Sequence, residues 1–321
     1  KIEFQAALAR HCNYLGLLHQ DEGDRTAAAA QFEQALALCE NLLNEKPDAA
    51  EYRSLLAATC GYLGHVRYAT GDHAGARQLL DRASELLERL VATNPAVGRF
   101  QEQLASAVGQ LGLLMHELGD YDAAIECFDR GHAIREPLVK TNPQDAILHS
   151  SIAANAHNKG RTLGNSGRYA EALLAFQLAA DHQRIAFGRA PEVKRYRLNL
   201  SNHLKGVAQA AREIGRLAES AAAARERQSL WPDEPNELYS VAHEMCDCVV
   251  RVGKDKNNLT AEEQAERERY LQWAIAALQQ AVASGFNDRD RLRSDHSLDS
   301  LRGRPEFRDF LDTLAKQRQS P

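Results

Sequence analysis

The sequence is poor in aromatic residues and carries no excess of positive charge. Aromatic residues make up 6% of the 321 residues, and the formal net charge is −5. An acidic balance gives no general attraction for nucleic acid or anionic lipid. No apolar run approaches the roughly 18 residues of a membrane span, and no signal-peptide pattern is found at the start. We therefore expect a protein that binds no nucleic acid and does not insert into a membrane.

Motifs that would assign a catalytic chemistry are also missing. The sequence has no GxGxxG or GxxxxGK(S/T) phosphate loop, and none of its six cysteines forms a CxxC pair. Cys12 and Cys60 stand 48 residues apart, in equivalent places where a small buried side chain fits. Reduced thiols favour a cytoplasmic location. We expect no enzyme in this segment, with no catalytic residue, no cofactor and no metal.

What the sequence does have is a long internal period. Two series of glycines and one of prolines recur at a constant step of 48 residues: Gly23, Gly71, Gly119, Gly167 and Gly215; Gly16, Gly64, Gly112 and Gly160; and Pro47, Pro95, Pro143 and Pro191. A fixed period of this size indicates a solenoid, in which small units bury their apolar faces on their neighbours. Abundant alanine favours close-packed helices over sheets.

Each unit is predicted to be a pair of helices. After Pro143 the first helix starts at Gln144-Asp145 and runs to about Asn165, and the second runs from about Ala170 to Phe187. Gly167 between them fits the left-handed position that closes a helix. Pro191 prevents the second helix from continuing.

The units are predicted to follow one another along most of the chain. We place repeats at 1–48, 49–96, 97–144, 145–192 and 193–235, an irregular sixth pair at 236–284, and a C-terminal cap with a frayed tail at 285–321. The fifth repeat decays, because Ser220, Ala224 and Arg227 replace its usual apolar or small residues. In the sixth pair, helices are expected near 236–252 and 260–284, the latter with a Thr260–Glu263 capping box. The cap has its own apolar set, Leu292, Leu298, Leu301, Phe307, Phe310 and Leu311.

The repeat pattern resembles the tetratricopeptide repeat. Leu15-Gly16, Leu63-Gly64 and Leu111-Gly112 match its first helix, and Ala28-x3-Phe32, Ala124-x3-Phe128 and Ala172-x3-Phe176 match its second. The period exceeds the family's usual length of about 34 residues by two turns per helix, which keeps the same side buried. The resemblance implies an all-α, right-handed α-solenoid of about five helix-turn-helix repeats, followed by the irregular sixth pair and the helical cap.

In the family that the chain resembles, first helices line a concave surface that takes a peptide or a partner's helix. Carried over from the Leu-Gly positions, the lining residues here are Asn13, Tyr14, Tyr62, His65, Tyr68, Gln110, His116, His157, Asn158, Arg161, Asn202, Lys205, Gln209 and Arg212. The early repeats give an aromatic strip, Tyr14, Tyr62 and Tyr68. The later repeats give a basic strip, Arg161, Lys205 and Arg212, which suits an acidic or polar peptide.

A narrower resemblance concerns the repeat subtype. Phe4-Gln5-x2-Leu8-Ala9 and Phe100-Gln101-x2-Leu104-Ala105, each followed by Leu-Gly, are similar to long repeats appended to planctomycete-type bacterial serine/threonine protein kinases. The chain starts at Lys1, near a repeat boundary. We therefore expect a non-catalytic docking or regulatory scaffold of a larger signalling protein, with the kinase domain upstream. Two alternatives stay open: a self-association module that forms a weak homodimer through the last repeat, and an enzyme site within 236–321.

Overall fold

The computed structural model describes residues 2–316, apart from the side chains of Arg289 and of residues 313–316. The described chain is all-helical and contains no strand. It forms two compact units that divide between Ser166 and Gly167. The division falls inside the predicted repeat 145–192, between its first and its second helix.

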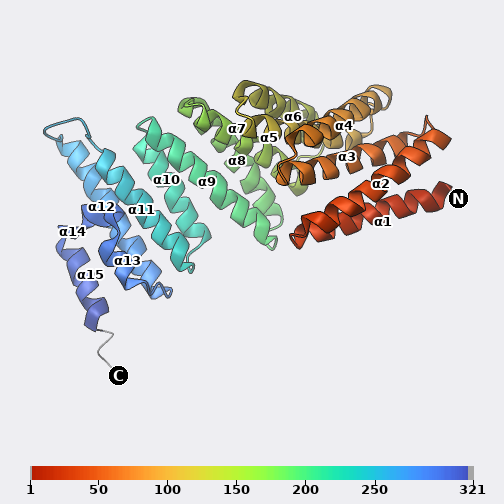
Figure 1. Ribbon diagram of the computed structural model, residues 1–321. Helices are drawn as coiled ribbons and strands as arrows, with labels where there is room; N and C mark the ends of the chain where they lie inside the picture. Colours follow the sequence, from red (N-terminus) through yellow and green to blue (C-terminus); the bar gives the residue numbers. More distant parts are fainter. Residues whose placement is uncertain (1, 317–321) are drawn as a thin grey trace. The chain divides into compact units, whose positions relative to one another are not determined.

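The first unit consists of consecutive helices joined by short turns. They are α1 (Ile2–Asp21), α2 (Arg25–Glu45), α3 (Ala50–Ala69), α4 (His73–Thr93), α5 (Gly98–Glu117), α6 (Tyr121–Thr141) and α7 (Ala146–Asn165). α1 packs on α2, α3 on α4 and α5 on α6, and each second helix also packs on the first helix of the following pair (Figure 1). This is the stacking of helix pairs expected for a solenoid.

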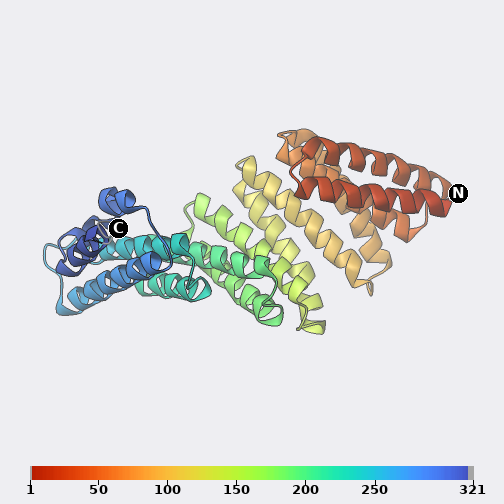
Figure 2. The ribbon, with the colours of Figure 1, turned by 90° about the horizontal axis from the view of Figure 1, so that it is seen from below.

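The second unit continues the same pattern and then departs from it. Its helices are α8 (Tyr169–Arg189), α9 (Lys194–Glu213), α10 (Leu217–Leu230), α11 (Pro235–Arg251), α12 (Ala261–Ala283), α13 (Arg289–Ser294), η1 (His296–Leu298), α14 (Asp299–Arg302) and α15 (Pro305–Lys316). α10 is shorter than the earlier second helices, and α11 with α12 forms the sixth pair (Figure 2). Thr260 and Glu263 form the predicted capping box of α12.

The turns within the pairs are fixed by glycine. Gly23, Gly71, Gly119, Gly167 and Gly215 all have positive φ, between 74° and 85°. A residue with a Cβ is strained in this left-handed conformation, so the left-handed turn predicted at Gly167 is confirmed. In the first unit, the aspartate after each turn glycine caps the following helix: the carboxylates of Asp24, Asp72 and Asp120 accept hydrogen bonds from the backbone N–H groups of Ala27, Gly75 and Ala123.

Within a pair, a glycine of the first helix makes room for a large residue of the second. A Cβ on Gly16 would lie 2.4 Å from the Phe32 ring, and one on Gly112 would lie 2.8 Å from the Phe128 ring. Both rings are fully buried. Phe32 and Phe128, which match the second-helix pattern of the repeat, thus fill the space between the helices of their pairs in the first unit.

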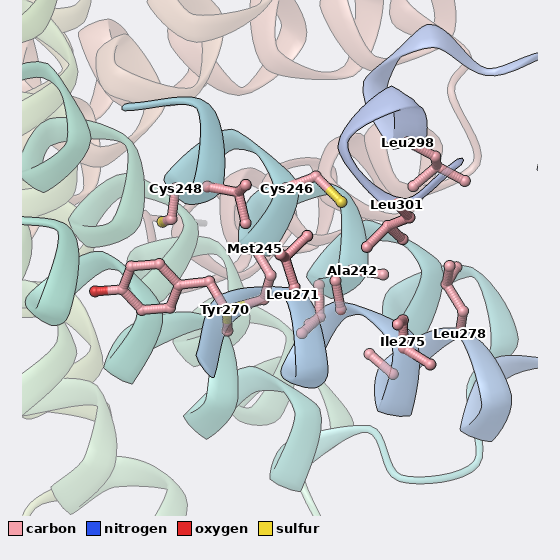
Figure 3. Packing of buried hydrophobic residues seen from close by; sticks show 14 of the residues in the cluster. Ala242, Met245, Cys246, Cys248, Tyr270, Leu271, Ile275, Leu278, Leu298 and Leu301 are labelled. Atoms are coloured by element: carbon pink, nitrogen blue, oxygen red, sulfur yellow. The ribbon is translucent and has the colours of Figure 1, made fainter. Parts of the chain in front are cut away.

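The predicted cap also packs as expected within the second unit. Leu292, Leu298, Leu301 and Phe307 are buried in one core cluster with residues of α11 and α12, and Phe310 and Leu311 pack at its edge. Figure 3 shows Leu298 and Leu301 close to Ala242 and Cys246 of α11. The hydroxyl of Tyr239 donates to Asp295, while the Phe286 ring stacks on the Tyr239 ring at 4.7 Å. The cap is therefore held by both apolar and polar contacts.

Replacing Gly112 by alanine tests the close approach of α5 and α6. We expect Gly112→Ala to lower the free energy of unfolding by about 1–3 kcal/mol, because its methyl group would overlap the Phe128 ring. Gly164→Ala is the matched control: a Cβ there meets nothing within 4 Å, so stability should stay unchanged or rise. Urea denaturation measures both. Equal effects of the two substitutions would contradict the proposed packing role.

Candidate partner-binding surface

The residues predicted to line a binding surface lie on the first helices of the pairs. In the first unit they are carried by α1, α3, α5 and α7, and in the second unit by α9. Their environments differ strongly: some are exposed, some are half-buried, and some are enclosed between neighbouring first helices.

Two of these residues are interior groups that join first helices. The amide of Asn13 on α1 donates to the hydroxyl of Thr59 on α3 at 2.8 Å. His116 on α5 is joined to α7 by Nδ1, 2.9 Å from the Thr162 hydroxyl, and by Nε2, 3.3 Å from the Asn165 amide. Asn13 and His116 are both buried. Direct contact with a partner does not fit their burial, because their polar atoms are used to join adjacent pairs.

The aromatic strip of the first unit remains partly accessible. Tyr14 is well exposed, whereas Tyr62 is half-buried with its ring 5.5 Å from that of Phe32. Tyr68 lies between His65 and His73, at ring distances of 6.2 and 6.1 Å. Tyr14 therefore offers most of the free aromatic area, and Tyr62 is held by its contact with the core.

A small hollow opens between α3 and α5 beside this strip. It has a volume of about 80 Å³, and its lining includes Gly61, Tyr62, Gln103, Ser106 and Gln110. Gly61 leaves the space open because it has no side chain. Within the part of the chain that the structure describes, the buried Oε1 of Gln110 has no hydrogen-bond partner. Sequence reasoning identified Tyr62 and Gln110 but missed Gln103 and Ser106, which lie outside the positions carried over from the family.

On α7, three predicted residues face different surroundings. Arg161 is exposed, whereas Asn158 and His157 are half-buried. The backbone carbonyl of Asn158 accepts a hydrogen bond from the Thr162 hydroxyl. Burial and the charge of Arg161 lower the pKa of His157 to about 4. The pKa of His116 is also lowered, chiefly by burial. Since the Thr162 hydroxyl uses its proton on Asn158, it accepts from Nδ1–H of a neutral His116.

In the second unit the basic residues are already paired. The Lys205 ammonium lies 3.1 Å from Glu237, and Arg212 donates to the Ser220 hydroxyl at 3.0 Å and lies 3.9 Å from Glu244. Both glutamates belong to α11. Lys205 and Arg212 therefore do not form a free basic strip on α9, because both lie close to glutamates of the sixth pair. Asn202 and Gln209, also on α9, are exposed.

Arg227 completes this network and explains the irregular fifth repeat. Its side chain is fully buried and donates to Glu237 at 2.8 Å and, more closely, to Glu244. Ser220 is also buried and accepts from the Cys248 thiol at 3.6 Å. Polar contacts between α10 and α11 thus replace the small-residue packing of earlier repeats.

Little else in the described residues suggests chemistry. No group of three or more His, Cys, Asp or Glu side chains there is arranged to hold a metal ion, and no described helix combines the length and apolarity needed to cross a bilayer. Burial raises the pKa of Cys39, Cys60 and Cys246 to about 11, so these thiols stay protonated and unreactive at neutral pH.

Comparison with known proteins finds similarity to one repeat family. Models of the tetratricopeptide repeat match residues 8–48 and 105–131. Both stretches are similar to this repeat. They cover most of α1 with α2, and the facing parts of α5 and α6, where the Gly16–Phe32 and Gly112–Phe128 contacts lie.

Solved structures of similar fold are tetratricopeptide-like. The nuclear import adaptor Nro1 of S. pombe has a TM-score of 0.64 at 11% identity, over 94% of this chain and 99% of that chain. The apo form of RapI has a TM-score of 0.52 at 13% identity, over 96% and 99%. BtubC from P. vanneervenii has a TM-score of 0.50 at 18% identity, over 71% and 86%. At these identities the likeness concerns the fold alone. None of the curated proteins matches this chain in sequence.

The lowered histidine pKa values predict a loss of stability in mild acid. His157 and His116 bind a proton less readily when folded, so the contribution of each is complete above the unfolded pKa of about 6.5 and is lost as the pH falls below it. For His157 the loss continues until the pH approaches its folded pKa of about 4. We expect His157 alone to reduce the free energy of unfolding by about 1–2 kcal/mol between pH 7 and pH 5. His157→Gln should flatten the pH profile of urea denaturation, whereas His11→Gln, at an exposed position, should leave it unchanged. If the wild-type chain and both variants lost stability with falling pH at the same rate, His157 would not be the group responsible.

Removing Arg227 tests the buried network of the second unit. Arg227→Ala should lower the free energy of unfolding by about 3–5 kcal/mol, because Glu244 would remain buried without its main partner. Arg216→Ala removes an exposed pair with Glu219 and should cost less than about 1 kcal/mol. Both values come from chemical denaturation. A small effect of Arg227→Ala would mean that the network contributes little.

Proposed function

We propose that this chain is a non-catalytic interaction scaffold that binds a peptide or partner protein on the first-helix side of the first unit. The observation that carries the proposal is the hollow between α3 and α5, which Tyr62 lines, together with the exposed Tyr14 at the equivalent position of α1. Tyrosine offers a large contact area with a polar end, and such residues dominate binding energy at interfaces. Nro1, a distant neighbour in fold, is described as an adaptor, which agrees with this type of function.

The hollow suits a small side chain of an extended peptide. Its volume of about 80 Å³ is that of a few methyl groups, and Ala57, Ala107 and Leu87 make its floor apolar. The Gln110 carbonyl lacks a donor and can accept an N–H of the ligand backbone. A buried acceptor that gains a partner on binding favours the complex over the free state.

The chemical character of the ligand rests on Arg161. Its guanidinium is exposed, whereas Lys205 and Arg212 share their charge with Glu237 and Glu244. An acidic group on the peptide would pair with Arg161. We further propose that the chain is cytoplasmic and monomeric. It serves as the docking region of a larger signalling protein, and the subtype resemblance suggests that this larger protein is a serine/threonine kinase. The kinase part is tested by the parent gene, which should encode a kinase domain upstream.

Peptide selection tests the binding surface directly. Peptides selected from a displayed library on the wild-type chain should lose at least tenfold in affinity on Tyr14→Ala, because the exposed ring makes no contact needed for folding. Arg161→Glu should weaken acidic peptides and spare neutral ones. Leu174→Ala, at an exposed site of the second unit, is the control and should have no effect. If the selected peptides bind all variants equally, the surface lies elsewhere.

A further inference from the structure

α1 presents to solvent an apolar face that the later first helices bury. Phe4 is 72% exposed and Leu18 43% exposed, and His11 between them is also exposed. These residues are spaced seven apart, so they lie on one side of the helix. Single exposed apolar residues are common on proteins, so the exposure of Phe4 and Leu18 has to be judged against the equivalent positions of the other first helices.

The same positions in α3, α5 and α7 show what normally covers them. Residues 48, 96 and 144 positions after Phe4 are Tyr52, Phe100 and Leu148, which are 9%, 2% and 7% exposed. The equivalents of Leu18 are Val66, Leu114 and Thr162, at 2%, 0% and 0%. The equivalents of His11 are all buried: Thr59, Ala107 and Asn155. Among the described first helices of the first unit, α1 alone has this face open.

The covering element is in each case the second helix of the preceding pair. Tyr52 lies in a core cluster with Leu42 of α2. Phe100 lies in a cluster with Leu87 and Leu90 of α4. The Asn155 amide donates to the carbonyl of Phe128 on α6 at 2.6 Å. In α3 and α5, leucines of the preceding second helix thus lie in one cluster with the large residue near the start of the first helix, and in α7 a hydrogen bond joins the same two kinds of helix.

We propose that the open face of α1 is a docking face for the second helix of a further tetratricopeptide-like pair, located ahead of α1 in the same polypeptide. The sequence Phe4-Gln5-x2-Leu8-Ala9 repeats Phe100-Gln101-x2-Leu104-Ala105, on which α4 packs. α4 is thus a direct template for the helix that we propose to dock there. A second copy offers no equivalent helix at its last pair, because the apolar faces of α11 and α12 are buried with the cap.

An in-register extension tests whether the face accepts such a pair. A copy of residues 49–96 is fused directly ahead of residue 1, so that α4 of the copy meets Phe4 as α4 meets Phe100. We expect amide exchange in α1 to slow by about tenfold or more. Phe4→Ala should leave exchange nearly unchanged in the original chain but accelerate it by on the order of a hundredfold in the extended chain, as for a buried phenylalanine. Leu174→Ala should change α1 exchange in neither protein.

Two further measurements decide the occupant. The original chain should sediment as a monomer, and the parent gene should encode, upstream of this segment, another pair with the Leu-Gly and Ala-x3-Phe pattern. A dimer that dissociates on Phe4→Glu would assign the face to a second copy and overturn the proposal. An unrelated upstream sequence, or an extended chain in which Phe4→Ala has no larger effect than in the original, would overturn it as well.

Discussion

The packing of the first unit depends on one constraint, the position of a first helix between two second helices, as for α3 between α2 and α4 and for α5 between α4 and α6. On one side its glycine receives a ring of its own pair, as at Gly112 and Phe128. On the other side its large residues press on the preceding pair, as Phe100 does on Leu87 and Leu90. Because both contacts recur with the repeat, the unit needs no central core, and its stability is a sum of similar neighbouring interfaces.

Polar groups within these interfaces limit how the pairs can slide. Asn13 with Thr59, and His116 with Thr162, join first helices that apolar packing alone would leave free to shift along each other. A buried donor or acceptor without its partner is costly, so only one register satisfies both groups. In the second unit Arg227 has a comparable role between α10 and α11, with charge in place of amide and hydroxyl. The decay of the fifth repeat is thus a change in the type of contact between neighbours.

Most of the fold could be predicted from the sequence, and the reason is its period. The glycine series located the turns within the first five pairs, since positive φ is required there and glycine adopts it without strain. The Thr260–Glu263 box and the apolar set of the cap were predictable because both are local patterns. The residues of the binding surface were harder to predict from the sequence. Asn13 and His116 occupy positions that point inward because of hydrogen bonds to residues about 46 positions away. Lys205 and Arg212 pair with Glu237 and Glu244 of α11. Because α11 does not follow the 48-residue period, these partners could not be found from the positions of the earlier repeats.

The capped turns have a mechanical consequence. Asp24, Asp72 and Asp120 each cap a helix with a hydrogen bond inside their own turn, so these turns are held by local contacts while the pairs are held by their neighbours. When the ends of such a chain are pulled apart, force can peel off one pair while the next turn holds. The first unit should therefore unfold under force in steps of about one pair.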